Sequence, residues 1–303
     1  MVGRADRLGL RVWSLPHGAT LIDAGIEAPG SLEAGVLFAE ACLGGLGTVT
    51  LAPCDVVADL PLVAAVVTVA HPHVACLGSQ YAGWRIRAGA FSAMGSGPAR
   101  LLARVEALIN AMPYQEHSEV AALLLEGRAL PDDDVACDIA ARCGVKPSGL
   151  TLAIAPTASI VGTVQVAARS VEAGLHKMET VGFPPEAVRS AAGVCPVAPV
   201  GADDSQTMGR VNDCLLYAGQ AWYTVDVEDA AIERVLALLP ASASSAYGLP
   251  FADLLRQAGD FYRVDPLLFS VAQIVITNQR SGRTFRAGGT NHRVLRASLL
   301  GAP

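Results

Sequence analysis

Arg169 and Glu172 are the two side chains whose types and spacing best suit chemistry in this sequence. They stand three positions apart in an apolar segment, so on a helix they would lie side by side on one face. A carboxylate next to a cation on an apolar surface suits a general base that is oriented by its partner. Most pairs of this kind on helices are ordinary surface ion pairs, so the pair alone leaves both interpretations open.

The segment around this pair, residues 157–182, predicts one long helix. Thr157 and Ser159 are candidate N-caps, and Gly182 is a candidate for the residue just beyond the C-terminal end. Between them, apolar residues recur at steps of three and four, which predicts one buried stripe. These residues are Val161, Val164, Ala168, Val171, Leu175 and Met178.

Composition limits the classes of protein to which the chain can belong. Of its 303 residues 52% are hydrophobic and 17% are charged. The longest nearly uninterrupted apolar run, 60–70, is shorter than the ~20 residues of a spanning helix, and the first residues lack the pattern of a signal peptide. We therefore expect a cytoplasmic protein with no membrane span. A net charge of −6 without a basic cluster argues against nucleic-acid binding.

Cysteine and histidine spacing gives no metal or disulfide pattern. The seven cysteines have no C-x-x-C spacing, which predicts reduced thiols and neither a disulfide framework nor a zinc site. His71 and His73 follow a predicted buried strand over 62–69, but no third ligand is evident, so structural roles are favoured for both. We expect no bound metal.

A glycine cluster at 44–47 is the one candidate for a dinucleotide fingerprint. It ends a helix predicted to begin after Ser31 and leads into a strand predicted over 48–51. A Rossmann motif has the reverse order of strand, glycines and helix. The order therefore excludes a nicotinamide cofactor of that type.

Two glycine-rich stretches could bind a ligand. Ser79, Gln80, Tyr81 and Trp84 combine polar groups with aromatic rings, which suits a planar heterocycle, although the rings could equally fill a core. Gly95 and Ser96 precede a helix predicted over 99–109, where free backbone N–H groups can hold an anionic or carbonyl group. An unoccupied loop is the alternative there.

Three further residues complete the candidate set. Asp203 and Asp204 precede a helix predicted over 208–217, where they could cap the helix or face a positively charged substrate. Tyr247 lies in a loop that could form a lid or a pocket wall.

Strands and helices alternate irregularly along the whole chain, which favours an α+β fold. We expect two closely packed mixed α/β subdomains with a ligand pocket between them, forming one unit over 1–303. The polar stretch 118–134 is interpreted as a solvated loop, and a subdomain boundary is placed near 131–150.

Several longer stretches, in consistent order, resemble methenyltetrahydromethanopterin cyclohydrolases. They are PGSLEAGVLFAEACLGGLGTV (29–49), GSQYAGW (78–84), GSGPAR (95–100), TASIVGTVQ with ARSVEAGLHK (157–177), APVGADDSQTMGRVNDCLLYAG (198–219), DPLLFSVAQ (265–273) and GRTFRAGGTNHRVL (282–295). Tyr81 stands where archaeal relatives tend to carry lysine, which indicates a bacterial-type member.

The resemblance implies an activity and an assembly. Such enzymes hydrolyse the methenyl bridge of methenyltetrahydromethanopterin reversibly to the 5-formyl compound, in one-carbon metabolism and formaldehyde oxidation, as homotrimers without metal or redox cofactor. Here Glu172 would activate water with Arg169 as its partner, and 78–84 would belong to the pterin pocket. Two alternatives stay open, namely a cyclohydrolase for a related pterin or folate and a non-catalytic pterin carrier.

Overall fold

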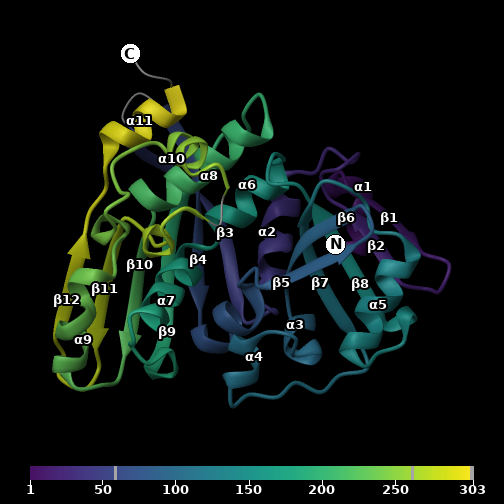
Figure 1. The fold of residues 1–303 in the computed structure, drawn as a ribbon, viewed down its shortest axis with the longest axis horizontal. Helices are drawn as coiled ribbons and strands as arrows, with labels where there is room; N and C mark the ends of the chain where they lie inside the picture. The colour runs from purple at the N-terminus through teal and green to yellow at the C-terminus, as the bar shows by residue number, and fades with distance from the viewer. Residues whose placement is uncertain (58–59, 261–262, 301–303) are drawn as a thin grey trace. The chain divides into compact units, whose positions relative to one another are not determined.

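The computed structural model describes residues 1–57, 60–260 and 263–300, which fold as two compact units (Figure 1). The first unit comprises residues 1–46 and 74–165, and the second comprises 47–73 and 166–303. The stretch 131–150, where a boundary was predicted, lies inside the first unit. Each unit contains its own six-stranded sheet. The predicted α+β fold class is confirmed.

The sheet of the first unit has the strand order β1-β2-β8-β7-β6-β5. Its centre is parallel, because β2 pairs with β8 and β8 with β7 in the same direction, whereas the outer pairs are antiparallel. The strands are β1 (Arg11–Ser14), β2 (Thr20–Asp23), β5 (Trp84–Ala88), β6 (Phe91–Ser96), β7 (Ala121–Gly127) and β8 (Leu150–Ala155).

Helices cover this sheet, and its central strands are buried on both faces. Along β7, Leu123 and Leu125 belong to one core, whereas the intervening Leu124 belongs to a second core with Phe38. This double burial is typical of parallel strands. The helical elements that lie wholly or mostly in this unit are η1 (Val2–Arg4), α1 (Ala5–Leu8), α2 (Leu32–Cys42), the π-helix η2 (His73–Gln80), α3 (Ala99–Ala103), α4 (Ala107–Ala111), α5 (Asp133–Cys143), η3 (Pro147–Gly149) and α6 (Ile160–Ala167).

The sheet of the second unit has the strand order β12-β11-β10-β9-β4-β3. Only β10 and β11 are parallel among these pairs. Its strands are β3 (Gly47–Val57), β4 (Leu60–Val69), β9 (Val188–Pro196), β10 (Gln220–Val225), β11 (Gln273–Asn278) and β12 (Thr284–Gly288). Its helical elements are α7 (Ser170–Thr180), η4 (Pro185–Ala187), α8 (Asp204–Ala218), α9 (Asp229–Val235), η5 (Leu236–Leu238), η6 (Ala241–Ala243), α10 (Phe251–Ala258), η8 (Pro266–Leu268) and α11 (His292–Leu300).

Two sequence predictions in the first unit are wrong. The stretch 118–134 is not a solvated loop, because β7 runs through it as a central strand whose apolar residues are buried. The helix predicted over 99–109 is divided into α3 and α4 at Arg104, which adopts a left-handed conformation with φ 47°. The Arg104 guanidinium stabilises this turn by donating to the Ile109 and Tyr114 carbonyl oxygens, each at 2.9 Å.

The glycine cluster ends a helix, as predicted. Gly44 and Gly45 follow α2 with φ of +67° and +72°, a conformation that favours glycine, and β3 begins directly afterwards. The order is therefore helix, glycines and strand, which is the reverse of a Rossmann motif.

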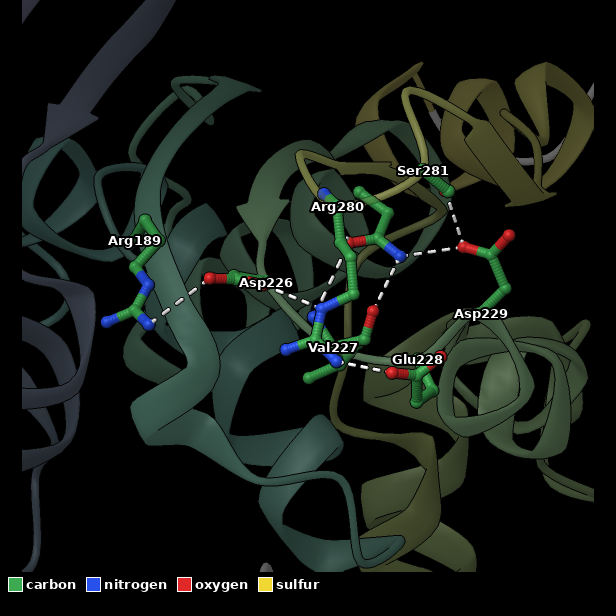
Figure 2. A network of polar contacts seen from close by, with 8 residues as sticks. Arg189, Asp226, Val227, Glu228, Asp229, Arg280 and Ser281 are labelled. Carbon is green, nitrogen blue, oxygen red and sulfur yellow. Dashed lines mark hydrogen bonds and ion pairs between the residues drawn. The ribbon is translucent and has the colours of Figure 1, made fainter.

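A network of exposed charges joins the β11–β12 turn to the loop after β10 (Figure 2). Arg280 donates to Asp226 at 3.0 Å and to Glu228 at 2.5 Å, while Arg189 pairs with Asp226 at 3.7 Å. Asp229 accepts hydrogen bonds from Ser281 and Asn278, each at 2.7 Å, and these contacts lower the pKa of its carboxyl group. We assign this network a structural role, because each of its charges has a partner of opposite sign.

None of the helices in the described ranges 1–57, 60–260 and 263–300 is both long and apolar enough to cross a membrane.

Asp213 makes the free energy of unfolding depend on pH in a predictable way. Its side chain on α8 is fully buried and accepts the Phe251 N–H at the start of α10, at 2.8 Å. Burial raises its pKa to about 7, although hydrogen bonds from Ser298 and Phe251 act in the opposite direction and Asp253 adds to the increase. The native state therefore keeps a proton that the unfolded state releases between about pH 4 and pH 7.

We expect the free energy of unfolding to fall as the pH rises through that window, because the native state binds more protons than the unfolded state. An Asp213→Asn substitution keeps a neutral acceptor and should abolish this component, so the variant should exceed the wild type in stability at pH 8. The midpoint of denaturant unfolding, measured across pH for both proteins, checks this. Parallel pH profiles would contradict it.

Candidate functional site

The predicted helix over 157–182 is two helices, and the break lies at the residue pair of interest. Helix α6 ends at Ala167 and α7 begins at Ser170, with Arg169 as its N-cap residue. The Arg169 N–H bonds to the Val166 carbonyl at 3.0 Å, and its own carbonyl accepts the Ala173 N–H at 2.8 Å. A new helix N-terminus is thereby created three residues before Glu172.

The outer ends of this helix pair follow the predicted capping. Ser159 accepts the Gly162 N–H at 3.0 Å, so it caps α6. Gly182 follows α7 with φ +83°, and the Phe183 N–H bonds to the Met178 carbonyl at 2.9 Å. This geometry is a Schellman motif, which satisfies the last carbonyl groups of the helix.

Glu172 lies in the first turn of α7, where the helix dipole favours a negative charge. Arg169 Nη1 donates to Glu172 Oε2 at 3.5 Å, and the two side chains are only 11% and 9% exposed. The pair is therefore a buried one, not the exposed surface pair that the sequence left open. This contact is long and uses one carboxylate oxygen, so it leaves acceptor lone pairs of the carboxylate for other donors, which a water-activating base requires.

Helix α7 is held on the sheet by close contacts beneath the pair. The Tyr223 hydroxyl on β10 donates to the Val171 carbonyl at 2.7 Å, next to Glu172. A Cβ at Gly174 would lie 2.2 Å from that hydroxyl oxygen, and a Cβ at Gly193 would lie 2.3 Å from Ser170 Oγ. These glycines allow the helix to approach the sheet, so the position of Glu172 is fixed by packing and not by a mobile loop.

The first unit gathers a second group of predicted residues at the C-terminal end of η2. The Ser79 hydroxyl, 1% exposed, donates to the Cys42 carbonyl at the end of α2 at 2.7 Å. The Ser79 carbonyl accepts the Gly97 N–H at 2.7 Å, which brings η2 to the end of β6, where Gly95 and Ser96 lie. The predicted residues of 78–84 and 95–96 are thus neighbours.

Arg100 organises this region, and the sequence did not indicate its role. Its guanidinium is fully buried and donates from Nη1 to the Leu77, Gly78 and Ser79 carbonyls at 3.0, 3.0 and 3.2 Å. The Glu106 carboxylate accepts hydrogen bonds from Nε at 2.8 Å and from Nη2 at 2.6 Å. Arg100 therefore fixes the backbone that carries Ser79, Gln80 and Tyr81.

The aromatic residues of this stretch differ in exposure. Tyr81 is half-buried, with the Arg100 guanidinium 5.4 Å from its ring centre. Trp84 is 4% exposed and belongs to the core of the first unit, a packing role that needs no ligand. Gln80 and Ser96 are buried. Contact of these four residues with a pterin stays a prediction.

In the second unit, Asp203 is the N-cap of α8 and accepts the Gln206 N–H at 2.8 Å, with Asp204 as the first helical residue. Tyr247 packs against Tyr217 with the rings tilted by 50° and their centres 4.9 Å apart, near the other end of the same helix. The two ends are separated by about 20 Å of helix. One ring system therefore cannot contact both the aspartate pair and Tyr247.

Glu126 is a further candidate that the sequence did not reveal. It lies near the end of β7 and accepts hydrogen bonds from Thr157 Oγ1 and, at 3.2 Å, from Gln165 Nε2. The carboxyl ends of β7 and its parallel neighbour β8 meet here, which is where open parallel sheets commonly bind ligands. No local motif marks Glu126, since its partners are 31 and 39 residues away.

Two other features bear on the site. A cavity of about 670 Å³ in the first unit is lined by residues including Arg104, Gln115 and Glu119, and none of the predicted site residues lines it.

His73 begins η2, and burial lowers its pKa, although Glu186 and Glu179 act in the opposite direction. A half-buried neutral histidine at this position is consistent with the structural role that was favoured.

Comparison with known proteins places the chain in a family. A sequence model described as "Cyclohydrolase (MCH)" matches residues 1–299. The methenyltetrahydromethanopterin cyclohydrolase of Xanthobacter autotrophicus is 44% identical over 290 residues, covering 95% of this chain and 86% of the relative. The proteins of that name from Methylobacterium organophilum and Methanocaldococcus jannaschii are 42% and 40% identical, each covering 99% of this chain and 94% of the relative. The chain belongs to the methenyltetrahydromethanopterin cyclohydrolase family.

Proposed function

We propose that this protein hydrolyses the methenyl bridge of methenyltetrahydromethanopterin to 5-formyl-tetrahydromethanopterin, and that it catalyses the reverse condensation as well. The observation that carries this proposal is the buried Arg169–Glu172 pair at the start of α7, in a chain of this family. A carrier would need no base, and burying two charges has a cost that needs a reason.

The substrate carbon lies between two nitrogens and is already cationic, so it reacts once water is deprotonated and the adduct is stabilised. Glu172 accepts a proton from water as the oxygen attacks this carbon. The same carboxyl group then donates the proton to the nitrogen that leaves as its C–N bond breaks, while the adduct's hydroxyl group loses its proton to solvent and becomes the formyl oxygen. One water is consumed, the formyl group stays on the other nitrogen, and one proton is released overall.

Arg169 acts as a positioning residue in this scheme. Its guanidinium orients Glu172 through their contact and places a positive charge beside the carboxyl group. The start of α7 adds the partial positive charge of its N–H groups. In the reverse reaction the same two side chains serve in the opposite order. The steps involve only side chains and water, and we propose that catalysis uses no metal or redox cofactor.

We further propose which residues bind the pterin. Ser79, Gln80, Tyr81, Trp84, Gly95 and Ser96 would contact the pterin, with Glu126 as an acceptor for its N–H groups. Asp203, Asp204 and Tyr247 would contact more distant parts of a long substrate. In line with the resemblance, we propose a cytoplasmic homotrimer that acts in one-carbon metabolism and formaldehyde oxidation.

Substituting Arg169 with lysine tests its positioning role. Lysine keeps the charge but not the planar fork, so we expect Arg169→Lys to lower kcat by at least about tenfold. Arg189→Lys, a change at an exposed arginine of the same unit, is the matched control and should match the wild type. Turnover of Arg169→Lys equal to that of the wild type would mean that only the charge matters.

The substrate class is tested by comparing methenyltetrahydromethanopterin with methenyltetrahydrofolate under identical conditions. We expect a kcat/KM at least about 100-fold higher for the methanopterin derivative, a ratio within reach of differential binding by buried polar groups. Equal values, or a preference for the folate, would replace the proposal by a cyclohydrolase for a related substrate.

A further inference from the structure

Three potential metal ligands from separate parts of the sequence converge in the first unit. His17 lies in the turn between β1 and β2, whereas Asp133 and Cys137 lie one turn apart on α5. One ligand atom from each side chain lies within 4.8 Å of the other two, and this is the one such group of three or more among the residues that the structure describes. The three atoms are an imidazole nitrogen, a carboxylate oxygen and a thiol sulfur.

The two elements that carry these ligands are held in place by a common core. Ala19, just before β2, and Leu21 on β2 pack in the same cluster as Val135 and Ala136 of α5. Asp132 caps α5 by accepting the Val135 N–H at 2.9 Å. The His17 N–H donates to Asp133 Oδ1 at 3.1 Å, and the ring Nδ1 contacts Oδ2. The ligands are therefore positioned before any ion arrives.

The local charge also favours a cation. Asp133 and Asp134 lie in the first turn of α5, one turn before Cys137, so their carboxylates create a negative potential that attracts a divalent ion. An ion bound there also stabilises the thiolate that ligates it.

We propose that His17, Asp133 and Cys137 bind one zinc ion. Nitrogen, sulfur and a single carboxylate oxygen suit Zn²⁺ better than Mg²⁺ or Ca²⁺, which prefer oxygen ligands. Tetrahedral bonds of ordinary length place zinc ligand atoms about 3.3–3.7 Å apart, so side-chain rotations that move the ligand atoms by about 1 Å complete the site. Three protein ligands leave a fourth position for water.

Binding would connect the β1–β2 turn to α5 across the surface of the first unit. The thiol proton is released to solvent, together with the imidazole proton when His17 is charged, and no redox change takes place. Since zinc would bind the folded state, it should raise the melting temperature of the whole protein. The role we assign to the ion is structural, and the cyclohydrolase mechanism does not depend on it.

Cobalt substitution provides the direct test. After treatment with a chelator, the full-length protein should bind one Co²⁺ per chain with a thiolate-to-cobalt charge-transfer band, and Zn²⁺ should abolish that band. Cys137→Ser should lose the band and bind Zn²⁺ at least about tenfold more weakly. Loss of a residue that only hydrogen-bonds to a metal ligand already weakens metal binding by about that factor. Cys54→Ser, at another half-buried cysteine, is the control and should bind like the wild type.

Alkylation of thiols gives an independent measurement on the same samples. Zn²⁺ should slow iodoacetamide modification of Cys137, and not that of Cys54, as followed by peptide mass spectrometry. The melting temperatures of the wild type and of Cys137→Ser should also be measured with and without Zn²⁺. We expect Zn²⁺ to raise the melting temperature of the wild type and not that of Cys137→Ser. Absence of the cobalt band in the wild type, or an unchanged zinc affinity in Cys137→Ser, would leave a metal-free His17–Asp133 ion pair and overturn the proposal.

Discussion

Glu172→Gln is expected to lower kcat by at least ~100-fold, the lower end of the contribution of a general base. Glutamine has nearly the same size and can still contact Arg169, but its amide cannot take a proton from water. Because the substitution removes the proton acceptor and leaves the shape of the binding surface nearly unchanged, KM should change little. The measurement is steady-state kinetics on methenyltetrahydromethanopterin, with circular dichroism to confirm that the fold is unchanged.

Glu179→Gln is the matched control for this experiment. Glu179 lies on the same helix, two turns further along, and is half-buried. Its substitution should leave kcat within about twofold of the wild type, since it touches neither the Arg169–Glu172 pair nor the start of α7. If Glu172→Gln retained activity similar to that of this control, the base would have to be another residue.

Arg100→Met is expected to be the most destabilising of these substitutions, at about 3–5 kcal/mol in the free energy of unfolding. Methionine fills part of the volume but removes both hydrogen bonds to the Glu106 carboxylate and one hydrogen bond from each of three buried carbonyl oxygens. Denaturant unfolding followed by tryptophan fluorescence measures the loss.

Two comparisons make the Arg100 prediction sharp. Arg142→Met breaks an exposed pair with Asp138, at 2.8 Å, and should cost no more than about 1 kcal/mol. The double substitution Arg100→Met with Glu106→Leu should recover part of the loss, because it removes the unpaired buried carboxylate. Equal stability of Arg100→Met and Arg142→Met would show that the buried guanidinium contributes no more than a surface charge.

The structure also indicates which features the sequence could predict. The caps at Ser31 and Gly182 are local events, read from a few neighbouring residues, and the structure confirms both. The Arg169–Glu172 pair was found because helical spacing is also local. The break between α6 and α7 was missed, since the apolar stripe continues through it and Arg169 is not a typical capping residue.

Features that depend on distant contacts could not be predicted. Strand β7 could not be predicted from composition, because its five apolar residues have acidic residues on both sides and the stretch as a whole is polar. Glu126, Arg100 and the group of His17, Asp133 and Cys137 are defined by partners far apart along the chain or by backbone carbonyls, which no spacing rule marks. Topology brings them together, and it is set by the packing of the whole unit.

We propose that this protein catalyses the hydrolysis and does not merely bind the pterin. The most direct test is the decay of the methenyl chromophore of methenyltetrahydromethanopterin after adding equal amounts of wild type or Glu172→Gln, against a sample without protein. We expect rapid decay with the wild type and a rate close to the spontaneous one with the variant. Decay at the spontaneous rate with both proteins, while both bind the pterin, would contradict it and indicate a carrier.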